Sequence, residues 1–328
     1  MILPQLISAL VMVTPQLGYA VGGKQTDTRL GLYRTADGAR TWSAIAGIHP
    51  TNTPSVSRGV VFVPVRAGYE RSDDGGRTWQ RTTLPDAGRG SAGQVQLLDA
   101  RHAYARLDLG AAAGSSGESL YSSSDGGRTW RFVSTTSTTS TPSGSLPFGC
   151  DKDGYGFATT TLGWAGAYCA GGRPFLYRTT DGGRTWRYVG VPGIGRYCGC
   201  DTSTPTFFDA RHGAFAVVGF AARPVTRTYW TTDGGLHWRP SDAPFGRGGQ
   251  VTFVDARSAW VPGGPKFDRL AVTTDAGLHW RTVRVAFDLR NYRLVPVSRT
   301  VAYALGVTTT RTVLRRTDDG GRTWHAVR

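Results

Sequence analysis

The stretch Ser72-Asp73-Asp74-Gly75-Gly76-Arg77-Thr78-Trp79 is one of seven near-copies in a chain of 328 residues. Every copy has a hydroxyl residue first, an aspartate two positions later, a glycine-bearing turn and a tryptophan in the last position. The other copies begin at Thr35, Ser123, Thr179, Thr231, Thr273 and Thr317. A pattern repeated this often indicates an internally repeated fold, which overrides the two domains that the length alone would suggest.

Each copy has the residue types of a tight turn between two strands. The aspartate can accept hydrogen bonds from backbone N–H groups just ahead, and glycine tolerates a positive φ. The residues before the turn alternate as in a strand, for example Leu120-Tyr121-Ser122, so each copy is predicted to be a hairpin tip. Burying a tryptophan contributes about 4–6 kcal/mol before opposing costs, against about 0.5–1.5 kcal/mol for a neutral hydrogen bond. Tryptophan is therefore expected to anchor each repeat, and aspartate to shape its turn.

The pattern resembles the Asp box, or BNR repeat, of sialidases, sortilin-type receptors, xyloglucanases and the propeller factors that assist photosystem II assembly. In those families the box lies at the turn between the third and fourth strands of a propeller blade. Two copies depart from it, with Ala39 and Ala276 in place of a glycine, and two have His237 and His279 in place of threonine. The resemblance implies a structural role for the aspartate and tryptophan of every box. These residues are Asp37, Trp42, Asp74, Trp79, Asp125, Trp130, Asp181, Trp186, Asp233, Trp238, Asp275, Trp280, Asp319 and Trp324.

The spacing of the copies predicts the architecture. Their tryptophans are 37 to 56 residues apart, with a mean of 47, which is close to the length of a four-stranded propeller blade. An aromatic strand with small neighbours, such as Ala259-Trp260-Val261, precedes most boxes, an order closer to the photosystem-assembly propellers than to the sialidases. We therefore predict an all-β protein with one domain over residues 1–328, a seven-bladed propeller of four-stranded antiparallel blades that closes by packing. The predicted blades cover about residues 4–47, 53–84, 93–134, 150–191, 202–241, 249–286 and 292–328.

The positive charge is distributed along the repeats. The formal net charge is +15, and three of the 38 basic residues are lysine. A ring of arginines favours loose attraction to anionic surfaces over binding in one nucleic-acid groove, so nucleic acid is not an expected partner. Nine arginines lie in a box or directly after one: Arg40, Arg77, Arg128, Arg131, Arg184, Arg187, Arg239, Arg281 and Arg322.

The four cysteines, Cys150, Cys169, Cys198 and Cys200, fall within 51 residues. Their spacing lacks the C-x-x-C pattern of zinc sites, so two disulfides are expected, and with them an oxidising compartment. Cys150 can pair with Cys169 on a neighbouring strand, or with Cys198 or Cys200. A bond between Cys198 and Cys200 is not expected, because such close spacing strains the disulfide geometry.

The sequence gives less direct evidence for the cellular compartment of the protein than for its fold. Residues Met1 to Ala20 make a poor signal peptide because they lack a basic start, and Val11-Met12-Val13 matches the first strand of later repeats. The expected location is extracytoplasmic, with an export signal upstream of Met1, or cytoplasmic if Met1 is the true start. No stretch of the sequence is long and apolar enough for a transmembrane segment.

Residues outside the repeats give little support for catalysis. The two glutamates are Glu70 and Glu118, and the second falls in a Gly/Ser-rich loop expected from Ala111 to Glu118. Asp151 and Asp153 are the one carboxylate pair outside the repeats that a hydrolase could use, and a solvated loop explains them better. The Arg-Ile-Pro motif of sialidases is absent. No catalytic residue, metal site or cofactor is predicted.

The predicted function is therefore a non-catalytic binding or assembly module of the cell envelope, with a sialidase-like glycoside hydrolase as the alternative. The partner is expected to be a protein or an anionic or carbohydrate-bearing envelope component, bound by a monomer on the face opposite the boxes. The candidate contact residues are Arg173, Arg196 and Tyr197. Four segments without repeat character are expected to gather on that face. These are Leu109 to Glu118, Ser134 to Cys150, Cys169 to Pro174 and Val191 to Pro205.

Overall fold

A computed structural model of the chain describes residues 6–24, 27, 29–85, 87, 90–112, 114–137, 140–169, 173–195, 200–219, 224–246, 249–307 and 311–327. Within these ranges the protein is built from antiparallel strands, with a short 3-10 helix at Leu289–Asn291. Among the described residues, no helix has the length and apolar character needed to cross a membrane.

Five sheets have four strands each, and in each sheet the strands pair in the order in which they follow along the chain. Every strand therefore joins its neighbour through a short local connection, as the repeated hairpin turns predict. The first three of these sheets comprise β1 Leu6–Met12, β2 Gly18–Gly23, β3 Gly31–Thr35, β4 Ser43–Ile45; β5 Ser55–Ser57, β6 Val60–Val65, β7 Gly68–Ser72, β8 Gln80–Thr83; and β9 Ser91–Leu97, β10 Ala103–Ala112, β11 Ser115–Ser123, β12 Arg131–Thr136. The last two comprise β22 Thr252–Asp255, β23 Ser258–Gly263, β24 Arg269–Thr273, β25 Arg281–Arg284; and β26 Tyr292–Pro296, β27 Ala302–Val307, β28 Thr312–Thr317, β29 His325–Ala326.

The sixth sheet has nine strands, because one short strand bridges two groups. Its strands are β13 Asp151–Phe157, β14 Gly163–Tyr168, β15 Phe175–Thr179, β16 Arg187–Tyr188, β17 Cys200–Thr202, β18 Thr206–Phe207, β19 Gly213–Gly219, β20 Val225–Thr231 and β21 Arg239–Asp242. β17 pairs with β19 and also places Asp201 opposite Tyr168 of β14. A Cβ at Gly156 would lie 1.7 Å from the Pro205 carbonyl oxygen, so only glycine lets β13 approach the chain between β17 and β18 this closely.

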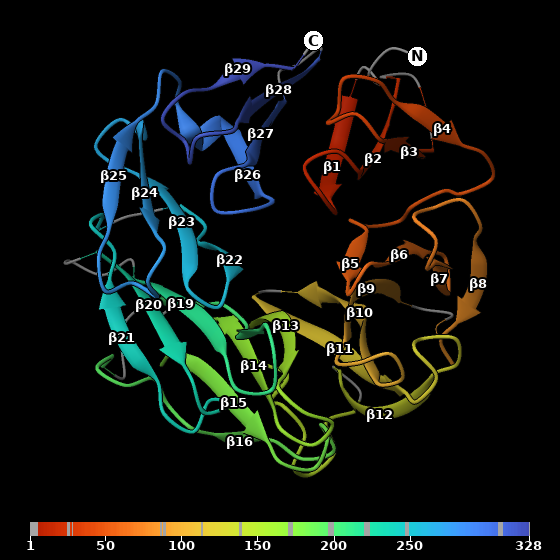
Figure 1. Cartoon of the computed structure of the whole chain (residues 1–328). Coiled ribbons are helices and arrows are strands. Elements are labelled where there is room, and N and C mark those ends of the chain that lie inside the picture. The colour runs from red at the N-terminus through yellow and green to blue at the C-terminus, as the bar shows by residue number, and fades with distance from the viewer. Residues whose placement is uncertain are drawn as a thin grey trace.

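The sheets stand side by side around a central opening, and the first and last sheets meet where the ring closes (Figure 1). The Ile7 N–H donates to Thr312 Oγ1 at 2.7 Å, and the Tyr303 hydroxyl and the Arg316 guanidinium both donate to the Pro15 carbonyl at 3.1 Å. Because β1–β4 and β26–β29 are separate sheets, residues 6–327 close the ring by packing and side-chain hydrogen bonds, with no shared strand among the described residues. Within these residues the closure is as predicted.

The apolar core lies between neighbouring sheets. Tyr104 of β10 stacks on Phe157 of β13, with 3.6 Å between ring centroids, and Tyr303 of β27 packs with Ile7 and Leu10 of β1. These aromatic side chains place apolar area in the contact between one sheet and the next, which holds the ring together. The equivalent aromatic residues of the second strands are all buried: Tyr19, Tyr104, Trp164, Phe215, Trp260 and Tyr303.

The strand order gives the ring two distinct faces. The seven eight-residue stretches defined above, here called the repeat turns, lie beside the turns between first and second strands. The Gly126 N–H donates to the Arg101 carbonyl at 2.6 Å, and the Gly320 N–H to the Thr300 carbonyl at 2.9 Å. We call this side the repeat face. The loops between second and third strands and the connections between sheets lie at the other ends of the strands, on what we call the loop face.

Candidate functional site

All seven repeat turns share one hydrogen-bond network. The hydroxyl of the first residue donates to the aspartate and accepts from the backbone N–H four residues on, as Thr179 does with Asp181 at 2.8 Å and Gly183 at 2.9 Å. Asp181 in turn accepts from the Thr185 backbone N–H at 2.9 Å and from its hydroxyl at 2.6 Å. The other six turns repeat the two bonds of the first hydroxyl and the backbone N–H bond to the aspartate. The second hydroxyl bond recurs in the four of them that have threonine at that position. The carboxylates are therefore occupied in holding the turns.

These bonds also keep the aspartates charged. The Thr41 hydroxyl and then its backbone N–H lower the pKa of Asp37 to about 2. The equivalent hydrogen bonds lower the pKa values of the aspartates in the other six turns, and partial desolvation opposes this effect in all seven. His237 and His279 replace the threonine hydroxyl, each with Nδ1 2.7 Å from the aspartate. A set of equivalent, charged and fully bonded carboxylates is a structural element and not a general acid.

The tryptophans anchor the turns unevenly. Trp42, Trp130 and Trp186 are buried, whereas the other four repeat tryptophans are partly exposed. The expectation that tryptophan provides most of the apolar burial therefore applies most strongly to the first, third and fourth turns. In the remaining turns the indole ring covers the outer part of the contact between two sheets.

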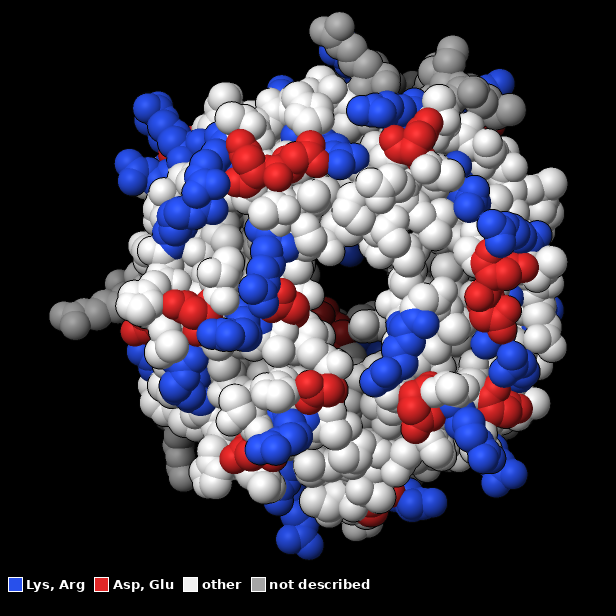
Figure 2. Space-filling model, in the orientation of Figure 1, with Lys and Arg blue, Asp and Glu red and all other residues white. Residues whose placement is uncertain are grey.

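Several arginines near the repeat turns bind the neighbouring sheet. Arg34 and Arg71 donate to the carbonyls of Gly75 and Gly126 in the next repeat turn, at 2.8 and 3.0 Å. Arg281, one of the nine arginines expected to form an outer ring, donates in the same way to Gly320 at 3.0 Å. Figure 2 shows acidic and basic side chains interspersed around the opening. These three arginines thus have a structural role, so they contribute less to a continuous basic surface.

One of the three predicted contact residues can be placed. Arg173 is exposed on the loop face between β14 and β15, and its guanidinium lies 4.1 Å from the centroid of the Tyr188 ring. Tyr188 and the neighbouring Val189 are themselves exposed. Arg196 and Tyr197 lie outside the described residues. Arg173 and Tyr188 together form a small cation–π surface at the outer edge of the ring.

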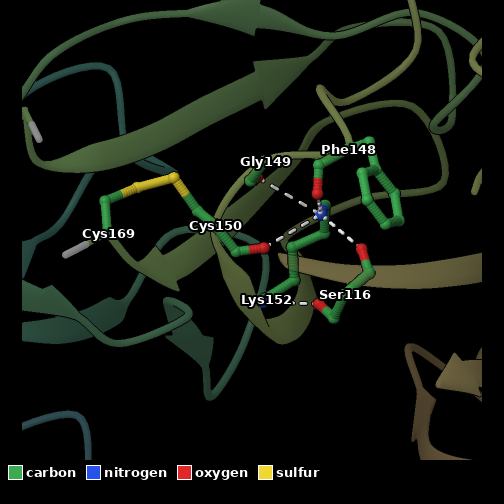
Figure 3. Close-up of a disulfide and its surroundings, with 6 residues drawn as sticks. All are labelled: Ser116, Phe148, Gly149, Cys150, Lys152 and Cys169. Carbon is green, nitrogen blue, oxygen red and sulfur yellow. Dashed lines mark hydrogen bonds between the residues drawn. A yellow bond between two sulfur atoms is a disulfide. The ribbon is translucent and has the colours of Figure 1, made fainter. Parts of the chain in front are cut away.

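A disulfide joins Cys150 to Cys169, which directly precede β13 and follow β14, with 4.7 Å between their Cα atoms (Figure 3). This is one of the pairings left open by the sequence. Cys200 is also disulfide-bonded. Cys198, for which no bond to Cys200 is expected, lies outside the described residues.

A buried lysine, Lys152, lies two residues after Cys150 of this disulfide. Lys152 is 4% exposed, and its Nζ donates to the carbonyls of Ser116 at 2.6 Å, Phe148 at 2.9 Å and Cys150 at 3.2 Å (Figure 3). The Lys152 backbone N–H donates to the Ser116 hydroxyl at 2.8 Å. Burial lowers the pKa of the Lys152 ammonium, and the nearby charge of Glu118 opposes that effect. The lysine therefore connects β11, β13 and the disulfide in one polar cluster.

Glu118 belongs to the same cluster and not to a loop. β10 reaches Ala112 and β11 starts at Ser115, so most of the expected Gly/Ser-rich loop from Ala111 to Glu118 is a long hairpin, and that prediction is wrong. The Glu118 side chain is 2% exposed and lies 3.7 Å from an Arg106 guanidinium nitrogen. Burial raises the pKa of Glu118, while Arg106 and Lys152 oppose the rise. The small residues of this hairpin let the strands pair and cover the carboxylate.

The segment from Ser134 to Cys150 does not stay on the loop face. The Ser134 hydroxyl donates to the Gly183 carbonyl and the Trp186 N–H to the Gly144 carbonyl, both at 2.7 Å and both beside a repeat turn. Leu146 is buried in the same cluster as Trp186. The prediction that this whole segment lies on the loop face is therefore wrong, because burying Leu146 draws the chain along the outside of the neighbouring strands.

Three carboxylates outside the repeats, Asp151, Asp153 and Asp201, lie near one another on β13 and β17. Asp151 and Asp153 are exposed on β13, in a strand and not in the expected loop. Burial, with Asp153 and Asp151 nearby, raises the pKa of Asp201. The cavity that Asp153 lines measures about 20 Å³, which is room for one water molecule. No three His, Cys, Asp or Glu side chains come together as metal ligands would within the described ranges.

Larger hollows lie elsewhere on the ring. One of about 670 Å³ opens on the repeat face, bordered by Arg58, Asp99, His102 and Asp209. Two others, of about 790 and 800 Å³, lie side by side on the loop face over β22–β27. The sequence did not predict them, because their walls come from three separate connections between strands. The sequence feature that could have indicated these hollows is the set of basic and aromatic residues in two of the connections, 265–269 and 284–293.

No protein-family model and no curated protein matches this chain. Among solved structures, YCF48 from Cyanidioschyzon merolae aligns over 97% of both chains at 18% identity, with a TM-score of 0.59. A structure of YCF48 bound to D1 peptide aligns over 95% of this chain and 93% of that one at 15% identity, with a TM-score of 0.57. The chain is a β-propeller. An oligogalacturonate lyase from Vibrio parahaemolyticus, at 9% identity and a TM-score of 0.62 over 94% of this chain and 88% of that one, shares this fold, so the propeller alone does not assign an activity.

Proposed function

We propose that this propeller is a non-catalytic binding module of the cell envelope that holds a protein partner on its loop face. The observation that carries the proposal is the use of the repeated carboxylates: every one is bonded within its own turn, so none is available for chemistry. The structure of YCF48 bound to D1 peptide is support by analogy, since a propeller of the same fold binds a protein segment.

The proposal includes seven blades in one domain. Each of the two strand groups in the nine-stranded sheet carries one repeat turn, at Thr179–Trp186 and Thr231–Trp238, so we count that sheet as two blades bridged by β17. The disulfide between Cys150 and Cys169 supports an extracytoplasmic location, because disulfides persist in oxidising compartments.

The test is capture of the partner from an extract of the cell envelope, with identification by mass spectrometry. The wild-type protein is compared with an Arg173→Glu/Arg196→Glu variant, here called the loop-face variant because Arg173 lies on that face, and with an Arg77→Glu/Arg187→Glu variant at the repeat turns, which has the same net charge. We expect the loop-face variant to lose the partner and the repeat-face variant to retain it. The opposite result would place the partner on the repeat face, and no enrichment over an unrelated basic protein would remove the binding function.

A glycoside hydrolase remains the second candidate because of one observation, the raised pKa of Asp201 beside Asp151 and Asp153, which is a property of general acids. The size of the nearby cavity argues against it. Turnover of sialosides or plant glucans that disappears in Asp201→Asn would replace the binding proposal.

A further inference from the structure

The two hollows on the loop face meet at Arg290, which borders both of them, and the Phe267 ring, which borders the second hollow, lies next to it; these two residues form a ridge. The first, of about 790 Å³, is bordered by Lys266, Arg284 and Phe287, and the second, of about 800 Å³, by Gln250, Arg293 and Leu294 among others. Each lies within the size range of ligand-binding pockets. The two hollows therefore form one continuous depression with a ridge across its middle, here called the double hollow.

The ridge is held in an uncommon backbone conformation. Phe267 has a φ of 52°, in the left-handed region that bulky residues rarely adopt. Its carbonyl accepts from the Leu289 N–H at 2.8 Å, and its ring lies 5.6 Å from the Arg290 guanidinium carbon. Arg290 is also fixed by two hydrogen bonds to Asp288 Oδ2, at 3.0 and 2.6 Å. Strained residues held by their surroundings are common at binding sites, and this one presents an aromatic ring and an immobilised cation together.

The charge of the double hollow is positive. Its border has four basic residues, Lys266, Arg284, Arg290 and Arg293, against two acidic ones, Asp268 and Asp288. The aspartates pair with Arg284 at 3.5 Å and Arg290 at 2.6 Å. Lys266 and Arg293 are exposed and make no ion pair with any other described residue. Two cations, one on each side of the ridge, are therefore free to bind acidic groups.

The floor of the first hollow is mostly apolar, whereas Gln250, Thr252 and Asn291 add polar groups to the border of the second. Val285 and Leu289 are buried beneath the border, and Phe287 and Leu294 extend the apolar surface. The Arg315 guanidinium covers the Phe287 ring at 4.8 Å from its centroid. A fully hydroxylated glycan would leave the apolar floor of the first hollow without matching groups, whereas apolar side chains of a protein segment would bury it.

We propose that the double hollow binds a protein segment in which acidic residues alternate with leucine or phenylalanine. The acidic side chains pair with Lys266 and Arg293, and the apolar ones lie on the floor beside Phe267 and Phe287. The inference rests on the proposed function, because it names the region of the loop face and the chemistry of the partner.

The probe is a fluorescein-labelled eight-residue peptide that alternates Asp or Glu with Leu or Phe, titrated with the protein and followed by fluorescence anisotropy. We expect saturable binding that weakens at least tenfold in Lys266→Glu/Arg293→Glu. The matched control is Arg77→Glu/Arg187→Glu, which makes the same change in net charge and should bind within twofold of wild type. A peptide with serine in place of leucine and phenylalanine should bind at least tenfold more weakly. Equal weakening in both variants, or no saturation with the wild type, would overturn the proposal.

A competition arm distinguishes a glycan from a protein segment. Polygalacturonate and heparin should not displace the peptide at physiological salt, and displacement by either at lower concentration than unlabelled peptide would overturn the assignment in favour of an anionic glycan.

Capture of a partner from an envelope extract separates this inference from the proposed function. If wild-type protein captures a partner and Lys266→Glu/Arg293→Glu captures it equally, the double hollow is not its site and the binding function stands. If wild type captures nothing, the proposed function itself falls.

Discussion

The Lys152 ammonium donates a 2.6 Å hydrogen bond to the carbonyl oxygen of Ser116, and so joins β13 to β11 of the neighbouring sheet. The bond lies directly beside the disulfide of Cys150 and runs parallel to a second link, from the Ser116 N–H to the Cys150 carbonyl at 3.1 Å. The contact between these two sheets is thus held by a buried charge and a backbone hydrogen bond as well as by apolar packing, next to a disulfide that ties the ends of β13 and β14 together.

Replacing Lys152 by methionine should lower the free energy of unfolding by about 3 kcal/mol or more, because several buried carbonyls lose their donor and Glu118 loses a nearby positive charge. Urea denaturation followed by tryptophan fluorescence measures the change. Lys266→Met, at an exposed position, is the control and should change stability by no more than about 0.5 kcal/mol. Equal effects of the two substitutions would show that the ammonium contributes nothing to stability.

Removing the disulfide with Cys150→Ala/Cys169→Ala should cost about 3 kcal/mol, given the 19-residue separation of the two cysteines. Peptide mapping of the native protein without reduction should yield a cross-linked peptide containing both residues. Detection of free thiols at Cys150 and Cys169 in protein purified without reductant would contradict the pairing and the oxidising compartment.

Trp186→Ala should destabilise the protein by about 3–5 kcal/mol, and Asp181→Asn by about 1–2 kcal/mol, because the buried indole loses far more apolar contact than the turn loses in hydrogen bonding. Thermal denaturation of both variants gives the comparison. Similar melting temperatures would mean that Asp181 does more than shape its turn.

Ala276→Gly should stabilise the protein by about 0.5 kcal/mol, since Ala276 has a φ of 60° where alanine is strained and glycine is not. The equivalent glycine of the preceding repeat turn provides the reverse test. In Gly234→Ala the new Cβ would lie 2.9 Å from the Ala210 carbonyl oxygen at a φ of 75°, so this variant should lose about 1 kcal/mol or more. Chemical denaturation that gives both changes the same sign would refute the strain argument.

Stability should decrease as the pH falls from about 4 to about 2. The folded-state pKa values of Asp37, Asp125, Asp275 and Asp319 are about 2, below the ordinary value of 3.8. The unfolded chain therefore binds more protons in this range, and the stabilisation is fully present above it and lost on acidification. Asp319→Asn should make the dependence on pH shallower. A free energy of unfolding that stays constant between pH 5 and pH 2.5 would contradict this account.

The sequence by itself determined the all-β propeller and the role of its repeated residues. The pattern from Ser72 to Trp79 needs only local contacts, since its hydroxyl, aspartate and glycine residues bond to backbone groups within four residues, and the regular spacing of the copies implies the same unit around a ring. Such local chemistry can be read from residue types alone.

Only the tertiary structure decided which side chains from separate repeats meet. Lys152 and Glu118 are polar residues that a sequence places in solvent, and their burial follows from the approach of two sheets whose residues are 34 positions apart. The double hollow likewise joins Lys266 to Arg293 through loops that come together when the sheets pack. The strand-by-strand pattern carries no information on such contacts, because they depend on the distance and angle between neighbouring sheets.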